Sequence, residues 1–156
     1  MQLAPTVREI IQRHQRSAPV KVGAVAAELG LTVLRSDLPV GISGMLSRDS
    51  TDREKWIIRV NRHEHKHRQR FTIAHEIAHF LLHRDEIDEG ITDDSFYRSG
   101  LSERREWEAN KLAADILMPW PLVRSLANEG KVTASELASA LEVSEAAMNI
   151  RLGNPT

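Results

Sequence analysis

The segment from Arg68 to His83 constrains the fold more than any other part of the chain. Its apolar residues recur on several faces of a helix and leave few polar positions. The apolar residues are Phe71, Ile73, Ala74, Ile77, Ala78, Phe80, Leu81 and Leu82. A helix with so little polar surface must be covered by other elements on most of its sides. We therefore expect a buried central helix on which the rest of the protein packs.

Two histidines of this helix stand four positions apart, in the stretch His75-Glu76-Ile77-Ala78-His79. That spacing places both imidazoles one turn apart on the same helix face, where they can bind one metal ion. Glu76 lies beside the ion without binding it, and a carboxylate there can take a proton from metal-activated water. The pattern is that of zinc peptidases, and it predicts a Zn²⁺ site with Glu76 as the catalytic base.

A catalytic zinc ion needs a third protein ligand and an open fourth position. The metzincin pattern would place a glycine and a histidine where this chain has Leu82 and Asp85, so we expect the ligand elsewhere. The best source is the helix expected from Glu103 to Leu117, whose EWEAN stretch offers two carboxylates, Glu106 and Glu108. These stand about 200° apart around the helix, so only one of them can face the metal.

Composition narrows the class of protein further. The 156 residues include no cysteine, which excludes a disulfide scaffold, a thiolate zinc finger and a cysteine nucleophile. Lys plus Arg number 21 against 22 Asp plus Glu, and this balance predicts no direct nucleic-acid partner. No apolar run is long enough for a membrane span or an export signal, so we expect a cytoplasmic protein with no membrane partner.

The remaining pattern predicts the α+β class. Short helices are expected at 4–16 and 22–29, and strands at 31–34, 42–46 and 56–60. The acidic segment 84–99 is expected to be a long loop with a solvated face. We expect a small antiparallel or mixed sheet packed on the active-site helix and a second long helix, with short terminal helices. We expect the whole chain, 1–156, to form one domain. Its segment 132–152 is a small helix-turn-helix-like tail, whose two helices have Thr133 and Ser144 as N-caps.

The two central motifs together resemble the ImmA/IrrE family of zinc metallopeptidases. In that family H-E-x-x-H is followed by E-x-x-A-N/D and a leucine-rich helix that ends in Met-Pro, and here FTIAHEIAHFLLH is followed by EWEANKLAADILMP. The resemblance implies a gluzincin-like minimal metallopeptidase with His75, His79 and Glu106 as zinc ligands and Glu76 as the base. Asn110, one turn after Glu106, would then bond a ligating histidine and fix its tautomer.

The sequence leaves two possible roles open for each of three residues. Glu108 competes with Glu106 as the third ligand, although the i, i+4 pairing with Asn110 favours Glu106. His83 continues the face of the two motif histidines and is either a structural histidine or a partner of the site. Tyr97 is either an oxyanion stabiliser or an aromatic residue that packs a loop.

The predicted function is a zinc-dependent endopeptidase that hydrolyses a peptide bond with metal-activated water. If the strand near Trp56 to Asn61 forms the sheet edge, it could pair with an extended substrate. The resemblance implies a protein partner, a helix-turn-helix transcriptional repressor of the Xre type, often in a toxin-antitoxin module. The alternative is a non-catalytic, zinc-stabilised partner-binding protein, and Glu76 separates the two because a structural site needs no base and normally closes its fourth position. DNA binding by the terminal helices is disfavoured by their few basic residues.

Overall fold

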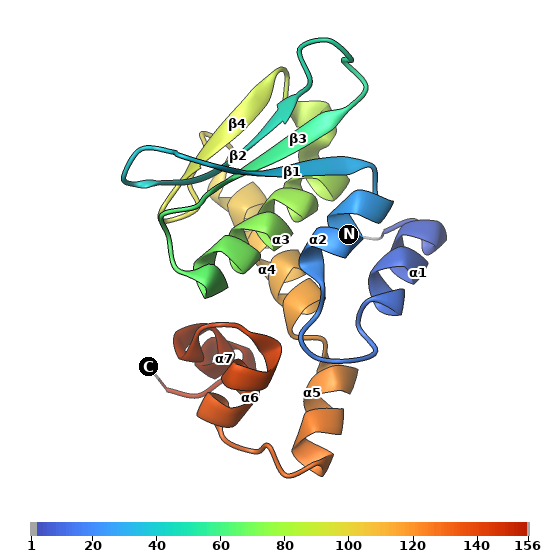
Figure 1. Cartoon of the computed structure of the whole chain (residues 1–156), viewed down its shortest axis with the longest axis vertical. Helices are drawn as coiled ribbons and strands as arrows, with labels where there is room; N and C mark the ends of the chain where they lie inside the picture. Colours follow the sequence, from blue (N-terminus) through green and yellow to red (C-terminus); the bar gives the residue numbers. More distant parts are fainter. Residues whose placement is uncertain (1–2, 156) are drawn as a thin grey trace.

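Four strands form one mixed sheet in the spatial order β1-β3-β2-β4 (Figure 1). The computed structural model describes residues 3–155, and its strands are β1 (Leu31–Ser36), β2 (Ile42–Arg48), β3 (Trp56–Asn61) and β4 (Gly90–Asp94). Strand β1 runs parallel to β3, whereas β2 is antiparallel to both β3 and β4. The mixed sheet confirms the expected α+β class.

Helices lie below the sheet and extend away from it (Figure 1). They are α1 (Pro5–Arg13), α2 (Val22–Glu28), α3 (Lys66–His83), α4 (Glu103–Leu117), α5 (Trp120–Asn128), α6 (Ala134–Leu141) and α7 (Glu145–Leu152), with a 3-10 turn η1 (Arg84–Glu86) after α3. Helix α3 packs on β2 and β3 on one side and on α4 on another, so it occupies the centre of the molecule. Helices α5 to α7 form a group at the end opposite the sheet.

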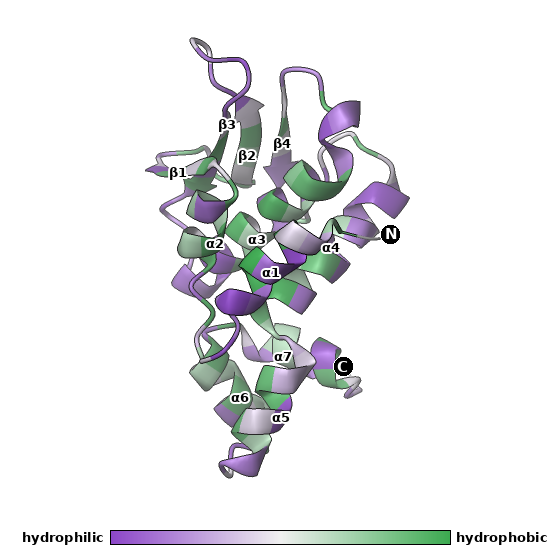
Figure 2. Ribbon diagram, turned by 90° about the vertical axis from the view of Figure 1, so that its right-hand side faces the viewer, coloured by the Kyte–Doolittle hydropathy of each residue, from purple (hydrophilic) through white to green (hydrophobic). Residues whose placement is uncertain are grey.

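The apolar core follows from the two periodicities of the sequence. In β3 every second residue, Trp56, Ile58 and Val60, is buried, as expected for a strand with one face against a helix. In Figure 2 hydrophobic residues gather on α3 and on the parts of α4 that face it. Complete burial of a large apolar side chain such as Ile77 or Ile116 stabilises the fold by about 1.5–3 kcal/mol.

The prediction of a loop over 84–99 is wrong in two places. Residues 84–86 form η1, and Gly90–Asp94 form the edge strand β4 on β2. The strand carries one large apolar residue, Ile91, so its hydrophobic pattern is weak. Gly90 permits the pairing, because a Cβ there would lie 2.7 Å from the carbonyl oxygen of Leu46 and 2.8 Å from Cβ of Ser47.

One further expectation needs correction. Strand β3 does not form a sheet edge, because β1 pairs with it on one side and β2 on the other, and the edges are β1 and β4. After Pro119 the chain forms helix α5, which was not among the expected helices, with a proline within its first two positions. Proline stops a helix interior but fits the first turn, where its missing N–H is not needed.

The C-terminal helices begin as the sequence predicts. Thr133 and Glu136 form a capping box at α6, and the Ser144 hydroxyl accepts a hydrogen bond from the Ala147 N–H at the start of α7. The side chain of Arg70 on α3 donates to the carbonyl oxygens of Val20, Leu141 and Glu142, and so ties the tail to the central helix. Within residues 3–155, none of the helices has the length and apolarity that a membrane crossing requires.

Candidate metal centre

Helices α3 and α4 bring three of the predicted site residues together. His75 and His79 are fully buried on α3, one turn apart. Oε1 of Glu106 on α4 lies 3.2 Å from Nε2 of His75 and 2.9 Å from Nε2 of His79. The helices can approach this closely because small buried side chains lie on both of them: Ala74, Ala78, Ala109 and Ala113.

A fourth residue, Asp93 on β4, joins this group. Its Oδ1 lies 3.4 Å from Nε2 of His75. One ligand atom from each of His75, His79, Asp93 and Glu106 lies within 4.8 Å of the others, and all four residues are buried. The assignment of Asp93 to a solvated acidic face is therefore wrong. The available signal was its i, i+2 spacing from Ile91, which places Asp93 on the same strand face as an apolar residue.

The spacing of these atoms fits a single metal ion. Nitrogen and oxygen ligands about 2.0–2.2 Å from a tetrahedral metal lie roughly 3.3–3.6 Å from one another. The separations of 2.9, 3.2 and 3.4 Å between these atoms are close to that range. Two imidazoles and two carboxylates are donors that divalent transition metals accept.

Unsatisfied polar atoms support the same conclusion. Across residues 3–155, hydrogen-bond partners are missing for five buried atoms here: Nε2 of His75 and both carboxylate oxygens of Glu76 and Asp93. Buried polar atoms normally have partners, and buried charges are normally paired or bound to a metal. A cation at the centre of the cluster would compensate these carboxylates.

The Nδ1 atom of each motif histidine contacts a further polar side chain. Nδ1 of His75 lies 2.9 Å from Oδ1 of Asn110, the contact expected of that residue. Nδ1 of His79 lies 2.9 Å from Nδ1 of His83. The remaining nitrogen of His83 lies 2.9 Å from Oε1 of Glu108, so Glu108 contacts His83 and not the cluster. These contacts fix the tautomers and leave both Nε2 atoms facing the cluster.

Burial and neighbouring charges shift the pKa values of the cluster in opposite directions. Burial, with the Asp93 charge adding to it, raises the pKa of Glu76 well above its ordinary value. Burial opposes ionisation of Glu106, but the nearby imidazoles of His75 and His79 and the hydroxyl of Ser99 outweigh it and lower its pKa to about 2. The structure thus separates a carboxyl group that holds a proton readily from a carboxylate that stays ionised.

The backbone of β2 closes the space above Glu76. A Cβ on Gly44 would lie 2.5 Å from Cγ2 of Thr72 and 3.2 Å from Oε2 of Glu76. A contact below 3.0 Å forces the surrounding atoms to move, so a larger residue at this position would displace Thr72 or the backbone of β2. The fully buried Glu76 carboxylate is thereby confined between α3 and β2.

Comparisons with known proteins can now be added to this geometry. The sequence profile of the IrrE N-terminal-like domain matches residues 26–153. The chain belongs to this family. Its members include the radiation response metalloprotease IrrE of Deinococcus radiodurans, which is 37% identical to this chain over 98 residues. The match spans 60% of the chain and 29% of that protein, so the chain corresponds to less than a third of its relative.

A solved structure shares the fold of this IrrE-type domain. A transcriptional regulator of Mycobacterium tuberculosis superposes with a TM-score of 0.62 and 16% sequence identity. The similarity covers 97% of this chain and 48% of that one. The comparison supports the α+β architecture, and the family match confirms the ImmA/IrrE resemblance read from the two motifs.

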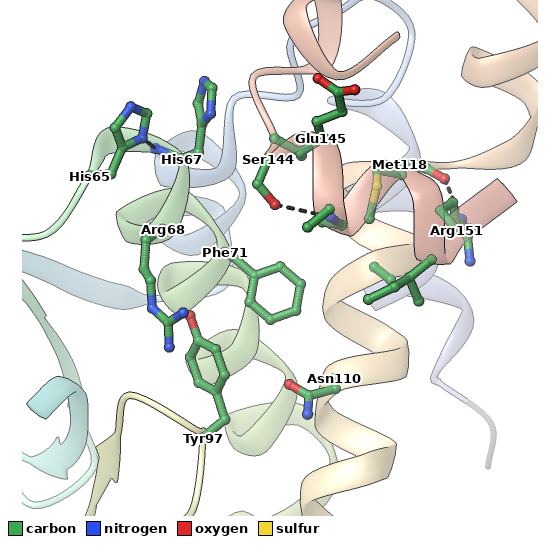
Figure 3. Close-up of a pocket in the computed structure, with 15 residues that line it drawn as sticks. His65, His67, Arg68, Phe71, Tyr97, Asn110, Met118, Ser144, Glu145 and Arg151 are labelled. Atoms are coloured by element: carbon green, nitrogen blue, oxygen red, sulfur yellow. Dashed lines mark hydrogen bonds between the residues drawn. The ribbon is translucent and has the colours of Figure 1, made fainter. Parts of the chain in front are cut away.

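A groove lies on the surface of the IrrE-type domain (Figure 3). Side chains of α3, α4 and α7 line it, and Tyr97 and Asn110 lie at one end while His65 and His67 lie at the other. The Tyr97 ring lies 4.6 Å from the ring of His75, and its hydroxyl lies 3.0 Å from Oγ1 of Thr72. Tyr97 and Asn110 therefore both contact His75, and through these contacts the groove adjoins the cluster.

Proposed function

We propose that this chain is a zinc-dependent endopeptidase, in which His75, His79 and Glu106 bind Zn²⁺ and Glu76 is the catalytic base. The observation that carries the proposal is the position of Glu76. Its carboxylate is buried beside the cluster and makes no hydrogen bond to another described side chain. A purely structural metal site would have no use for such a group.

The residues around the cluster suit peptide hydrolysis. A bound zinc ion would act as a Lewis acid and lower the pKa of water in contact with it toward neutrality. Glu76 would take a proton from the attacking water and pass it to the leaving amide nitrogen. Its raised pKa favours acceptance of that proton. Asn110 and His83 would keep the imidazoles of His75 and His79 in a fixed orientation during the reaction.

The surroundings of the site suit an extended polypeptide. Strand β4 pairs with β2 on one side only, so its other side presents backbone groups to which a substrate strand could bond. The groove beside Tyr97 offers apolar side chains to a substrate residue, among them Phe71, Met118 and Ile150. We propose an Xre-type helix-turn-helix repressor as the substrate and therefore a cytoplasmic role in transcriptional regulation or a toxin-antitoxin module.

Cleavage of a repressor encoded beside this chain tests the proposal. Zinc-loaded protein should cut it, and Glu76→Gln should abolish cleavage while the metal content stays at about one ion per chain. Glu54→Gln, an exposed position in the β2–β3 connection, is the matched control and should cleave normally. Cleavage by the Glu76→Gln protein would refute the assignment of the base.

One observation favours the second candidate, a non-catalytic zinc-stabilised binding protein. Asp93 completes a set of four protein donors, and four protein ligands are typical of structural zinc sites. On this hypothesis zinc would raise the unfolding temperature strongly, and no substrate would ever be cut. The role of Asp93 therefore decides between a permanently closed site and a site that opens.

A further inference from the structure

We propose that Asp93 is a displaceable fourth ligand that closes the metal site at rest, and that an oxygen donor entering the site must take its place. The proposal rests on the metal site described under the proposed function. It adds that this peptidase is latent until the edge strand β4 withdraws its carboxylate.

The first argument is the position of the Asp93 side chain. It is fully buried, and neither oxygen bonds to any other side chain in the part of the chain that the structure describes. Its Oδ1 lies 3.4 Å from Nε2 of His75, the separation expected of two atoms that bind the same ion. A buried carboxylate beside Glu76 and Glu106 would be strongly unfavourable without a cation between them.

The second argument is the element that carries each ligand. His75, His79 and Glu106 lie on α3 and α4, which pack against each other at the centre of the fold. Asp93 lies on a five-residue strand that, among the described residues, pairs with β2 alone. Of the four donors, Asp93 is therefore the one that can leave without any movement of the core.

The pairing of β4 with β2 is irregular where Asp93 lies. The register of β2 and β4 is irregular between Ile42 and Gly44, opposite Asp94 and Asp93. The chain then turns through Ser95 to Arg98, and the Asp94 carboxylate accepts hydrogen bonds from the N–H groups of Phe96 and Arg98. A shift of this end of β4 would withdraw Asp93 and move Tyr97, which lies between the cluster and the groove.

Spectroscopy of the Co²⁺-substituted full-length protein tests whether Asp93 is a ligand. We expect Asp93→Asn to lower zinc affinity roughly 10–100-fold and to change the visible Co²⁺ absorption, which depends on ligand number and type. Glu76→Gln replaces a neighbouring carboxyl group by an amide without removing a ligand, so it should leave the spectrum unchanged. Equal spectra and affinities for Asp93→Asn and wild type would overturn the proposal.

Competition by a small oxygen donor tests whether Asp93 closes the site. Acetohydroxamate, titrated into the Co²⁺ protein, must displace Asp93 in the wild type but finds an open position in Asp93→Ala. We expect about tenfold tighter binding to the variant. Equal affinity for the two proteins would show that Asp93 does not occupy the position that an incoming oxygen donor needs.

Two further measurements separate failures of different kinds. Thermal unfolding of the metal-free Asp93→Asn protein should match or exceed that of the wild type, because the substitution removes a buried charge. Wild-type zinc affinity in Glu106→Ala would overturn the proposed metal site itself. Loss of zinc in Glu106→Ala, together with Asp93 variants that behave as the wild type, would overturn the fourth-ligand proposal alone.

Discussion

The imidazoles of His79 and His83 meet through their Nδ1 atoms at 2.9 Å. One proton can lie between these two nitrogens. If Nε2 of His79 faces the metal, its Nδ1 carries the proton and donates to His83, which must then be protonated on Nε2 and donate to Glu108. Glu108 therefore determines the tautomer of His79 through His83, although it does not reach the cluster.

This relay predicts different effects for the two carboxylates of α4. Glu106→Ala removes a ligand and should abolish stoichiometric zinc binding. Glu108→Ala removes only an outer partner and should weaken zinc binding roughly tenfold. Glu108→Gln keeps an oxygen acceptor for His83 and should lie close to the wild type. Competition with a chromophoric chelator measures all three affinities, and full zinc retention by Glu106→Ala would reverse the assignment.

The contact of Asn110 with His75 gives a second prediction. Asn110→Leu leaves the N–H of His75 buried without an acceptor, which costs about 1–3 kcal/mol and frees the ring to turn. Zinc affinity should then fall roughly 10–100-fold. Asn110→Asp restores an acceptor and should recover most of the affinity. The same chelator titration measures both variants, and equal losses in the two would show that the acceptor is unimportant.

The strongly periodic helices could be predicted from sequence. Helix α3 follows from its dense apolar pattern, and it begins two residues before the expected position because the His65 side chain accepts a hydrogen bond from the His67 N–H. Helix α4 begins at Ser102 as its N-cap, whose hydroxyl accepts from the Arg105 N–H. In both helices the information is local, carried by side chains within one or two turns.

The remaining elements depend on partners distant in sequence. Strand β4 has one large apolar residue, and its existence depends on pairing with β2, more than 40 residues earlier. Strand β3 lies inside the sheet because β1 pairs with it in parallel at the edge, and no alternating pattern in the sequence reveals that pairing. Asp93 was missed for the same reason, because its burial is a property of the pairing and not of the acidic run in which it stands.

The raised pKa of Glu76 predicts how the stability of the metal-free protein depends on pH. The folded protein binds this proton more tightly than the unfolded chain, whose carboxyl titrates near 4.5. The stabilising contribution is therefore complete below that pH and is lost as the pH rises toward the folded pKa. Glu106 works in the opposite direction, and its contribution is lost only as the pH falls from 4.5 toward its pKa of about 2.

Urea unfolding in EDTA between pH 4 and pH 8 measures this dependence. Glu76→Gln should be about as stable as the wild type near pH 4 and more stable at pH 8. The difference should grow by about 1.4 kcal/mol for each pH unit between the two pKa values of Glu76. A difference that stays constant over this range would show that Glu76 ionises normally in the folded protein.

Gly44 provides a test of the packing around the base. An added Cβ would meet Cγ2 of Thr72 at 2.5 Å, the backbone oxygen of Arg59 at 3.0 Å and Oε2 of Glu76 at 3.2 Å. We expect Gly44→Ala to destabilise the fold by about 1–3 kcal/mol and to displace the Glu76 carboxylate. Peptidase activity should fall more than zinc affinity, because the metal-binding side chains lie on other elements.

Gly23→Ala is the matched control for this substitution. A Cβ on Gly23 would meet no atom within 4 Å, and the residue lies inside helix α2. Alanine favours a helix over glycine, so the change should stabilise the protein by up to about 1 kcal/mol without altering activity. If Gly44→Ala behaved like Gly23→Ala in urea unfolding and in cleavage, the tight contact between β2 and Glu76 would have no role in holding the base.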